Sequence, residues 1–77
     1  MDKIILLKGN EQIEKGVEEI VEEAKSNDFY YFHRDSSYAL LKELRDRLEE
    51  AGFQIGTFRE VKYGLDEKDY LYELHII

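Results

Sequence analysis

The stretch from Phe29 to Tyr38 constrains the fold most, because a strand pattern there runs directly into the start of a helix. Phe29 to His33 is dense in aromatic residues, which favour the pleated, half-buried surface of a sheet. Asp35 or Ser36 can then accept hydrogen bonds from the free backbone N–H groups of a following helix. We therefore expect the chain to be arranged around one central strand and the helix after it.

The residues before this centre predict one strand and one helix. Residues 3–8 form an apolar run between two lysines, which indicates a strand with both faces covered. Asn10 is a good helix N-cap, and apolar residues recur at helical spacing after it, so we predict a helix over residues 11–26. Its opposite side is rich in glutamate, which is typical of a solvated face, with an acidic docking face as the alternative.

The helix after the centre is predicted over residues 36–51, where leucines form one stripe. Gly52 suits the left-handed conformation that often follows the last helical residue. Phe53 can then fold back onto Leu48, as in a Schellman-type helix end. This signal fixes where the second helix stops.

The last third of the chain predicts a hairpin. Residues 53–63 have an extended pattern that Gly56 and Thr57 interrupt, which indicates a β-bulge. Residues 64–69 form a polar turn, and residues 70–77 alternate well enough to return as a second strand. The sequence therefore predicts a single domain over residues 1–77.

The predicted fold class is α/β, as a two-layer α+β sandwich. The elements would follow one another as βαβαββ, and two right-handed crossovers would place both helices on one face of a mixed four-stranded sheet. The preferred spatial order of the predicted strands is 1-2-4-3. The other face of this sheet would then be open.

Composition excludes several classes of function. The chain has no cysteine, so it holds neither a disulfide framework nor a thiolate metal site, and a cytoplasmic location is expected. Its net charge is −7, with 18 acids against 11 bases and no basic tract, which makes nucleic acid an unfavoured partner. No apolar run is long enough for a membrane span, and we expect no cofactor.

The order of elements resembles that of the Alba family of small chromatin and RNA-binding proteins, and of the C-terminal domain of translation initiation factor 3. Alba proteins carry lysines in the first loop and a basic segment between the second strand and helix. Here those positions hold Lys8-Gly9-Asn10-Glu11 and His33-Arg34-Asp35-Ser36. The resemblance implies a shared fold, a dimer and, as an alternative function, nucleic-acid binding.

One candidate site follows from the predicted parallel strands, whose carboxyl ends would share one edge of the sheet. Two cations, an imidazole and free backbone donors would meet there around a phosphate or carboxylate. The candidate residues for this anion site are Lys8, Gly9, Asn10, His33, Arg34, Ser36 and Ser37. The alternative is structural, with Asp35 and Ser36 capping the helix and Arg34 pairing with a carboxylate. No catalytic or metal site is predicted.

The second signal is the set of six tyrosines. With helices on one face of the sheet only, much of the aromatic and apolar strand surface is left over, and tyrosine is favoured at interfaces. The candidate interface residues are Tyr30, Tyr31, Tyr63, Tyr70, Leu71 and Tyr72. We therefore predict a non-enzymatic protein-interaction module, either a homodimer or an inhibitor or adaptor that docks on another protein.

Overall fold

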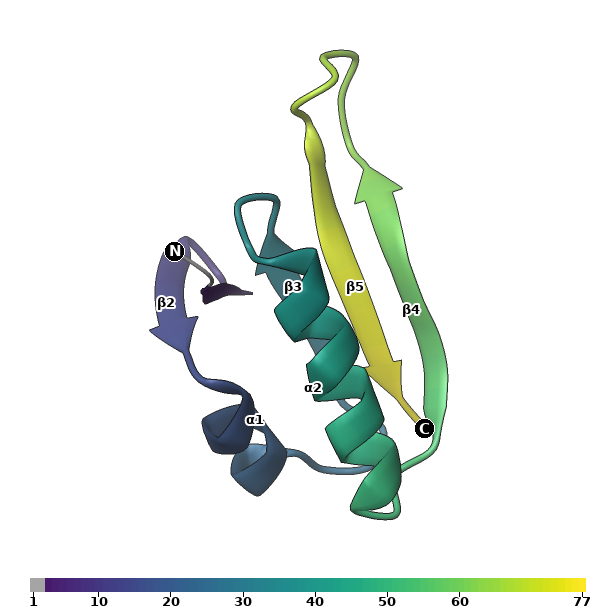
Figure 1. The fold of residues 1–77 in the computed structure, drawn as a ribbon. Helices are drawn as coiled ribbons and strands as arrows, with labels where there is room; N and C mark the ends of the chain where they lie inside the picture. Colours follow the sequence, from purple (N-terminus) through teal and green to yellow (C-terminus); the bar gives the residue numbers. More distant parts are fainter. Residues whose placement is uncertain (1–2) are drawn as a thin grey trace.

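Residues 3–77, the part of the chain that the computed structural model describes, form one five-stranded sheet and two helices (Figure 1). In chain order the elements are β1 (Ile4–Lys8), β2 (Glu11–Lys15), α1 (Val17–Glu23), β3 (Phe29–His33), α2 (Tyr38–Glu50), β4 (Ile55–Lys62) and β5 (Tyr70–Ile76). Within this range no helix is both long and apolar enough to cross a membrane.

The sheet has the order β2-β1-β3-β5-β4, and every pair of neighbouring strands is antiparallel. The prediction of a mixed four-stranded sheet in the order βαβαββ is therefore wrong, since the chain runs ββαβαββ. The four predicted strands do lie in the preferred order, and β2 is added outside β1. Both helices cover the same face of the sheet (Figure 1).

The missed strand explains the change in topology. Gly9 has a φ of 63°, and with Asn10 it makes a two-residue turn that pairs Lys8 with Glu11. Residues 11–15, predicted as the start of a helix, therefore return along β1, and α1 begins only after Gly16. This extra reversal makes β1 antiparallel to β3 where parallel pairing was predicted.

The connection from β3 into α2 is fixed by two serines with different roles. Ser37 is the N-cap of α2, because its side chain accepts a hydrogen bond from the Leu40 N–H at 3.3 Å. Ser36 is buried, and its Oγ accepts from the Ile5 N–H at 2.9 Å and donates to the Ile5 carbonyl at 3.3 Å. The prediction that Asp35 or Ser36 caps the helix was wrong, because Ser36 holds the loop against β1.

The end of α2 confirms the sequence prediction. Gly52 has a φ of 98°, and its N–H donates to the Glu49 carbonyl at 3.0 Å. The Phe53 N–H donates to the Leu48 carbonyl, also at 3.0 Å, which completes a Schellman motif. Phe53 packs against the core that contains Leu48.

The predicted bulge in β4 is also present, as a register shift between Ile55 and Thr57 opposite β5. A Cβ atom built on Gly56 would lie 2.7 Å from the Cγ1 atom of Ile77. A side chain at this position would therefore need the half-exposed Ile77 side chain to shift.

The core lies between the helix layer and one face of the sheet. It includes three leucines of α2 and one isoleucine of α1, packed on residues of alternate parity from β1, β3 and β5. Its buried members are Ile4, Leu6, Ile20, Phe32, Leu41, Leu44, Leu48, Leu74 and Ile76. This alternation leaves the other parity of each strand on the face that no helix covers.

Candidate functional site

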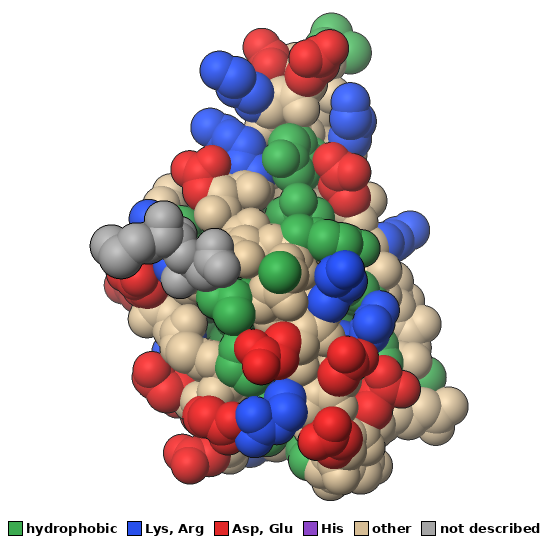
Figure 2. All heavy atoms as spheres, in the orientation of Figure 1, with side chains coloured by type: hydrophobic (Ala, Val, Ile, Leu, Met, Phe, Trp, Pro, Cys, Tyr) green, Lys and Arg blue, Asp and Glu red, His purple; other side chains and the backbone are tan. Residues whose placement is uncertain are grey.

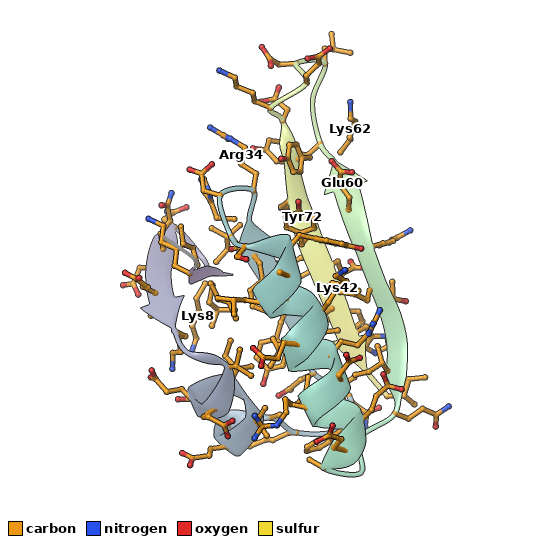
Figure 3. All side chains as sticks on the ribbon, viewed as in Figure 1. Lys8, Arg34, Lys42, Glu60, Lys62 and Tyr72 are labelled. Carbon is orange, nitrogen blue, oxygen red and sulfur yellow. The ribbon has the colours of Figure 1, made fainter. Side chains whose placement is uncertain are left out.

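The structure does not bring together the residues of the predicted anion site. Because β1 and β3 are antiparallel, Lys8, Gly9 and Asn10 lie at the end of the sheet opposite to His33 and Arg34. Figure 3 shows Lys8 and Arg34 at well-separated positions.

The remaining residues of that prediction have separate structural contacts. The side chains of Ser36 and Ser37 bond to Ile5 and to the first turn of α2. Arg34 pairs with no carboxylate among residues 3–77, and its Nη1 donates to the Lys68 carbonyl at 3.2 Å.

The predicted interface residues divide between the two faces of the sheet. Tyr31 and Leu71 lie on the uncovered face, and Tyr63 continues the same side of β4. Tyr30 and Tyr72 have the opposite parity and pack against the core, while Tyr70 starts β5 on that same side. The sequence pattern alone did not assign these five tyrosines and one leucine to one face or the other.

We call the uncovered side of the sheet the open face. Its apolar members come from four strands and the two chain segments that extend β4 and β5: Ile5, Leu7, Phe29, Tyr31, Val61, Tyr63, Leu71 and Ile77. Phe29 is 54% exposed and Tyr31 is 38% exposed. The Phe29 ring also stacks on the His75 imidazole with their centroids 3.9 Å apart. The open face therefore presents aromatic surface to solvent.

Two of the charges on the open face are matched across strands, whereas Glu14, which lies opposite Ile5, forms no ion pair within residues 3–77. Arg59 lies opposite Glu73, and its Nε donates to the Glu73 Oε1 at 3.2 Å. Glu73 lies in turn beside Tyr31 on β3. An internally paired carboxylate leaves the neighbouring apolar side chains available for contact with another surface.

A second aromatic cluster lies on the side of the sheet that carries the helices. We call it the helix-side patch, and its rings belong to Tyr38, Phe58, Tyr70 and Tyr72. The Tyr38 centroid is 5.8 Å from those of Phe58 and Tyr72, and Tyr70 meets Tyr72 edge to face at the same distance. Tyr38, at the start of α2, is 51% exposed. The patch is therefore continuous from α2 to the beginning of β5.

Basic side chains surround this patch. The Lys42 ammonium lies 5.3 Å from the Tyr38 ring centroid, and the Arg45 guanidinium lies 5.4 Å from that of Phe58. Lys62 and Glu60 of β4 lie opposite Tyr70 and Tyr72, and Figure 3 shows Tyr72 between them and Lys42.

Two of these cations are not matched by acids. Lys42 and Lys62 form no ion pair within residues 3–77, whereas Arg45 contacts Asp46. Figure 2 shows hydrophobic side chains on the upper part of this face with basic side chains beside them, while acidic side chains gather mainly lower down. The chain as a whole is acidic, but this patch carries unpaired basic side chains.

Two tyrosines have perturbed acidity. Burial, the neighbouring Tyr70 and the Glu60 carboxylate all raise the pKa of Tyr72 above its ordinary value. Burial and the Asp28 carboxylate raise the pKa of Tyr30 to about 12. Both phenols therefore stay protonated near neutral pH and can donate a hydrogen bond, and neither is activated as a nucleophile.

The sequence of this chain matches one protein-family model. The family model HP0268 matches residues 6–77, which is nearly the whole chain. The chain belongs to the HP0268 family. It matches none of the curated proteins and none of the solved structures with which it was compared. The family match does not connect the chain with Alba proteins or initiation factor 3, and the element order behind that resemblance is not the observed one.

Sequence reasoning missed the helix-side patch of this HP0268-family chain, although two signals for it are present. Tyr38 and Lys42 are four residues apart, which places them on one side of a helix. Phe58, Glu60 and Lys62 alternate along β4 and therefore share a face of the sheet. What the sequence could not show is that α2 lies beside β4 and β5 in the register that joins these two sets. Within residues 3–77 no group of acidic and histidine side chains is arranged to hold a metal ion.

Proposed function

We propose that this member of the HP0268 family is a non-enzymatic protein-interaction module that self-associates through the open face. The observation that supports this function is the exposed apolar and aromatic surface of four strands, which neither helix covers. Monomeric proteins seldom expose a contiguous apolar patch of this kind, and aromatic residues are enriched in protein interfaces.

The size of the open face suits a second copy of the same chain. A specific interface buries about 800 Å² on each partner. The two longer dimensions of the domain are 37 and 26 Å, and the sheet runs along the longer one (Figure 1). A two-fold pairing of open faces can therefore reach that area, and the Arg59–Glu73 pair would enter it already neutralised.

Sedimentation equilibrium tests this function on the full chain. We expect the mean mass to rise above the 9.2 kDa of one chain as the concentration increases through the micromolar range. A mass that stays at one chain at every accessible concentration would contradict self-association. The open face would then be left to a different protein, as for an inhibitor or adaptor.

A second candidate function is binding of single-stranded nucleic acid, and the helix-side patch favours it. Aromatic rings onto which bases can stack, together with unpaired cations that can neutralise phosphates, are the two components of such sites. The patch has both, in Tyr38 and Tyr72 and in Lys42 and Lys62. Stacking on aromatic residues contributes about 1–3 kcal/mol per base.

The net charge of −7 is an argument against this second function, but salt limits the distance over which the acidic side chains repel a phosphate. At physiological ionic strength, interactions between exposed charges are largely screened beyond about 8 Å, and the long dimension of the domain is 37 Å. Fluorescence anisotropy with single-stranded DNA and RNA at low salt tests it. Binding that weakens steeply as salt is added is expected. No anisotropy change for any oligonucleotide at low salt would contradict it.

A further inference from the structure

A hollow of about 440 Å³ lies at the end of the sheet where β3 ends and β5 begins. We call it the end hollow. Its lining comes from β1, β2, β3 and β5 and from the residues that directly follow β3 and β4: Leu7, Gln12, His33, Arg34, Tyr63, Tyr70 and Leu71. It lies on the open-face side, since Leu7, His33 and Leu71 share that face. None of these seven residues is acidic, although the chain carries 18 acids.

Arg34 is the only charged group in that lining whose charge is permanent. Its Nη1 donates to the Lys68 carbonyl at 3.2 Å, which holds the guanidinium beside the start of β5 (Figure 3). No carboxylate within residues 3–77 pairs with it. A guanidinium has five N–H donors in a planar fork, so several donors remain for a carboxylate or phosphate.

His33 supplies a second donor in a defined orientation. Its side chain is only 18% exposed, and its Nδ1 accepts a hydrogen bond from the Asp35 N–H at 3.0 Å. The neutral ring therefore carries its proton on Nε2. The hydroxyl groups of Tyr63 and Tyr70 and the side-chain amide of Gln12 are the other potential donors of the lining. Leu7 and Leu71 provide its apolar wall.

We propose that the end hollow binds a small organic anion, in which one carboxylate or phosphate is attached to a flat apolar body. Arg34 and the His33 Nε2–H would bind the anionic group, and the tyrosine and leucine side chains would contact the flat body. Binding sites for small molecules commonly combine an apolar wall with a few such polar groups. The end hollow shares Tyr70 with the helix-side patch. It shares Leu7, Tyr63 and Leu71 with the open face, so anion binding and self-association through the open face would compete.

NMR titration of the full chain with four probes tests the proposal and distinguishes the two anionic groups. Benzoate and adenosine monophosphate carry the carboxylate and the phosphate, and benzyl alcohol and adenosine are their uncharged counterparts. We expect saturable shifts of the Leu7, His33, Arg34 and Leu71 amides with at least one anion. The matching uncharged probe should bind about tenfold more weakly or not at all, because it lacks the charge-assisted hydrogen bonds.

The variant Arg34→Gln should weaken binding of that anion by about tenfold or more. Lys25→Gln is the matched control, because it also removes one positive charge from a side chain outside the hollow, and it should leave the affinity unchanged. The proposal would be overturned by equal affinity of Arg34→Gln and the unmodified chain, by shifts confined to the helix-side patch, or by no saturable binding of either anion. A spectrum of Arg34→Gln with unchanged dispersion shows that the variant is folded.

Discussion

The open face and the helix-side patch are both rich in aromatic residues, yet their surroundings differ. On the open face, Arg59 and Glu73 neutralise each other beside Tyr31. On the helix-side patch, Lys42 lies over Tyr38 without any carboxylate partner among residues 3–77. Apolar surface around a neutralised ion pair suits binding to another protein. Unpaired cations beside aromatic rings suit ligands that stack on the rings and carry phosphates.

Tyrosine content alone does not define a binding surface. Tyr31 and Tyr72 lie on neighbouring strands, but opposite parity places one in the open face and the other beside α2. A shift of either strand by one residue would move the tyrosine of that strand to the other face. Changes in the core, on each surface and at one half-buried phenol can therefore test the distinction between the two faces.

The largest effect is expected from Leu44→Ala, because both surfaces depend on the core between them. Leu44 is fully buried, and we expect its truncation to lower the free energy of unfolding by about 2–5 kcal/mol. Glu18→Ala is the control, since Glu18 is exposed and makes only a surface ion pair with Arg47, which contributes about 1 kcal/mol or less. Urea unfolding followed by circular dichroism measures both. Equal losses would mean that the two residues are not buried and exposed as described.

The next effect separates the two faces. Leu71→Asp places a charge on the open face, and we expect it to weaken self-association by about tenfold or more while the domain stays folded. Tyr38→Asp places the same charge on the helix-side patch and should leave association unchanged. Sedimentation of the two variants compares them directly. Association that is lost in Tyr38→Asp and kept in Leu71→Asp would reverse the assignment of the faces.

A smaller effect is expected from neutralising one cation of the patch. For single strands, the logarithm of the binding constant falls with the logarithm of the salt concentration by about 0.7 per phosphate contacted. Lys42→Gln should therefore weaken oligonucleotide binding and make its salt dependence less steep by about that amount. Lys25→Gln has the same loss of charge away from the patch and serves as the control. An identical salt dependence in both variants would remove Lys42 from the site.

The smallest effect concerns Tyr30, whose ring packs against the core between the two faces. Its pKa is raised from 10.0 to about 12 by burial and by Asp28, so the folded chain keeps this proton at a pH where the unfolded chain has lost it. The free energy of unfolding should therefore fall as the pH rises from about 10 to about 12. This part of the decrease should be missing in Tyr30→Phe.

Absorbance titration at alkaline pH measures the same ionisation directly. The titration curve of the unmodified chain should contain one phenol ionisation near pH 12 that is missing from the curve of Tyr30→Phe. A difference centred at the ordinary value of 10.0 would show that Tyr30 is not held in this environment.

Local sequence determined the features that depend on neighbouring residues. Three features could be predicted from the sequence: the aromatic strand Phe29–His33, the leucine stripe of α2, and the helix end at Gly52 and Phe53. Each depends on the intrinsic preferences of a few consecutive residues. The bulge next to Gly56 could be predicted for the same reason. The leftover strand face also followed from the count of apolar residues, although its extent did not.

Tertiary structure decided the features that depend on which segments meet. Residues 11–15 hold a single apolar side chain, Ile13, so their pattern fits a helix as well as a strand, and pairing with β1 selects the strand. That choice reversed β1 relative to β3, separated Lys8 from Arg34 and left Arg34 to line the end hollow. The positions of Tyr38 and Lys42 beside β4 and β5 likewise come from packing of the leucine stripe on the sheet, because contacts between distant segments are set by the burial of a common core.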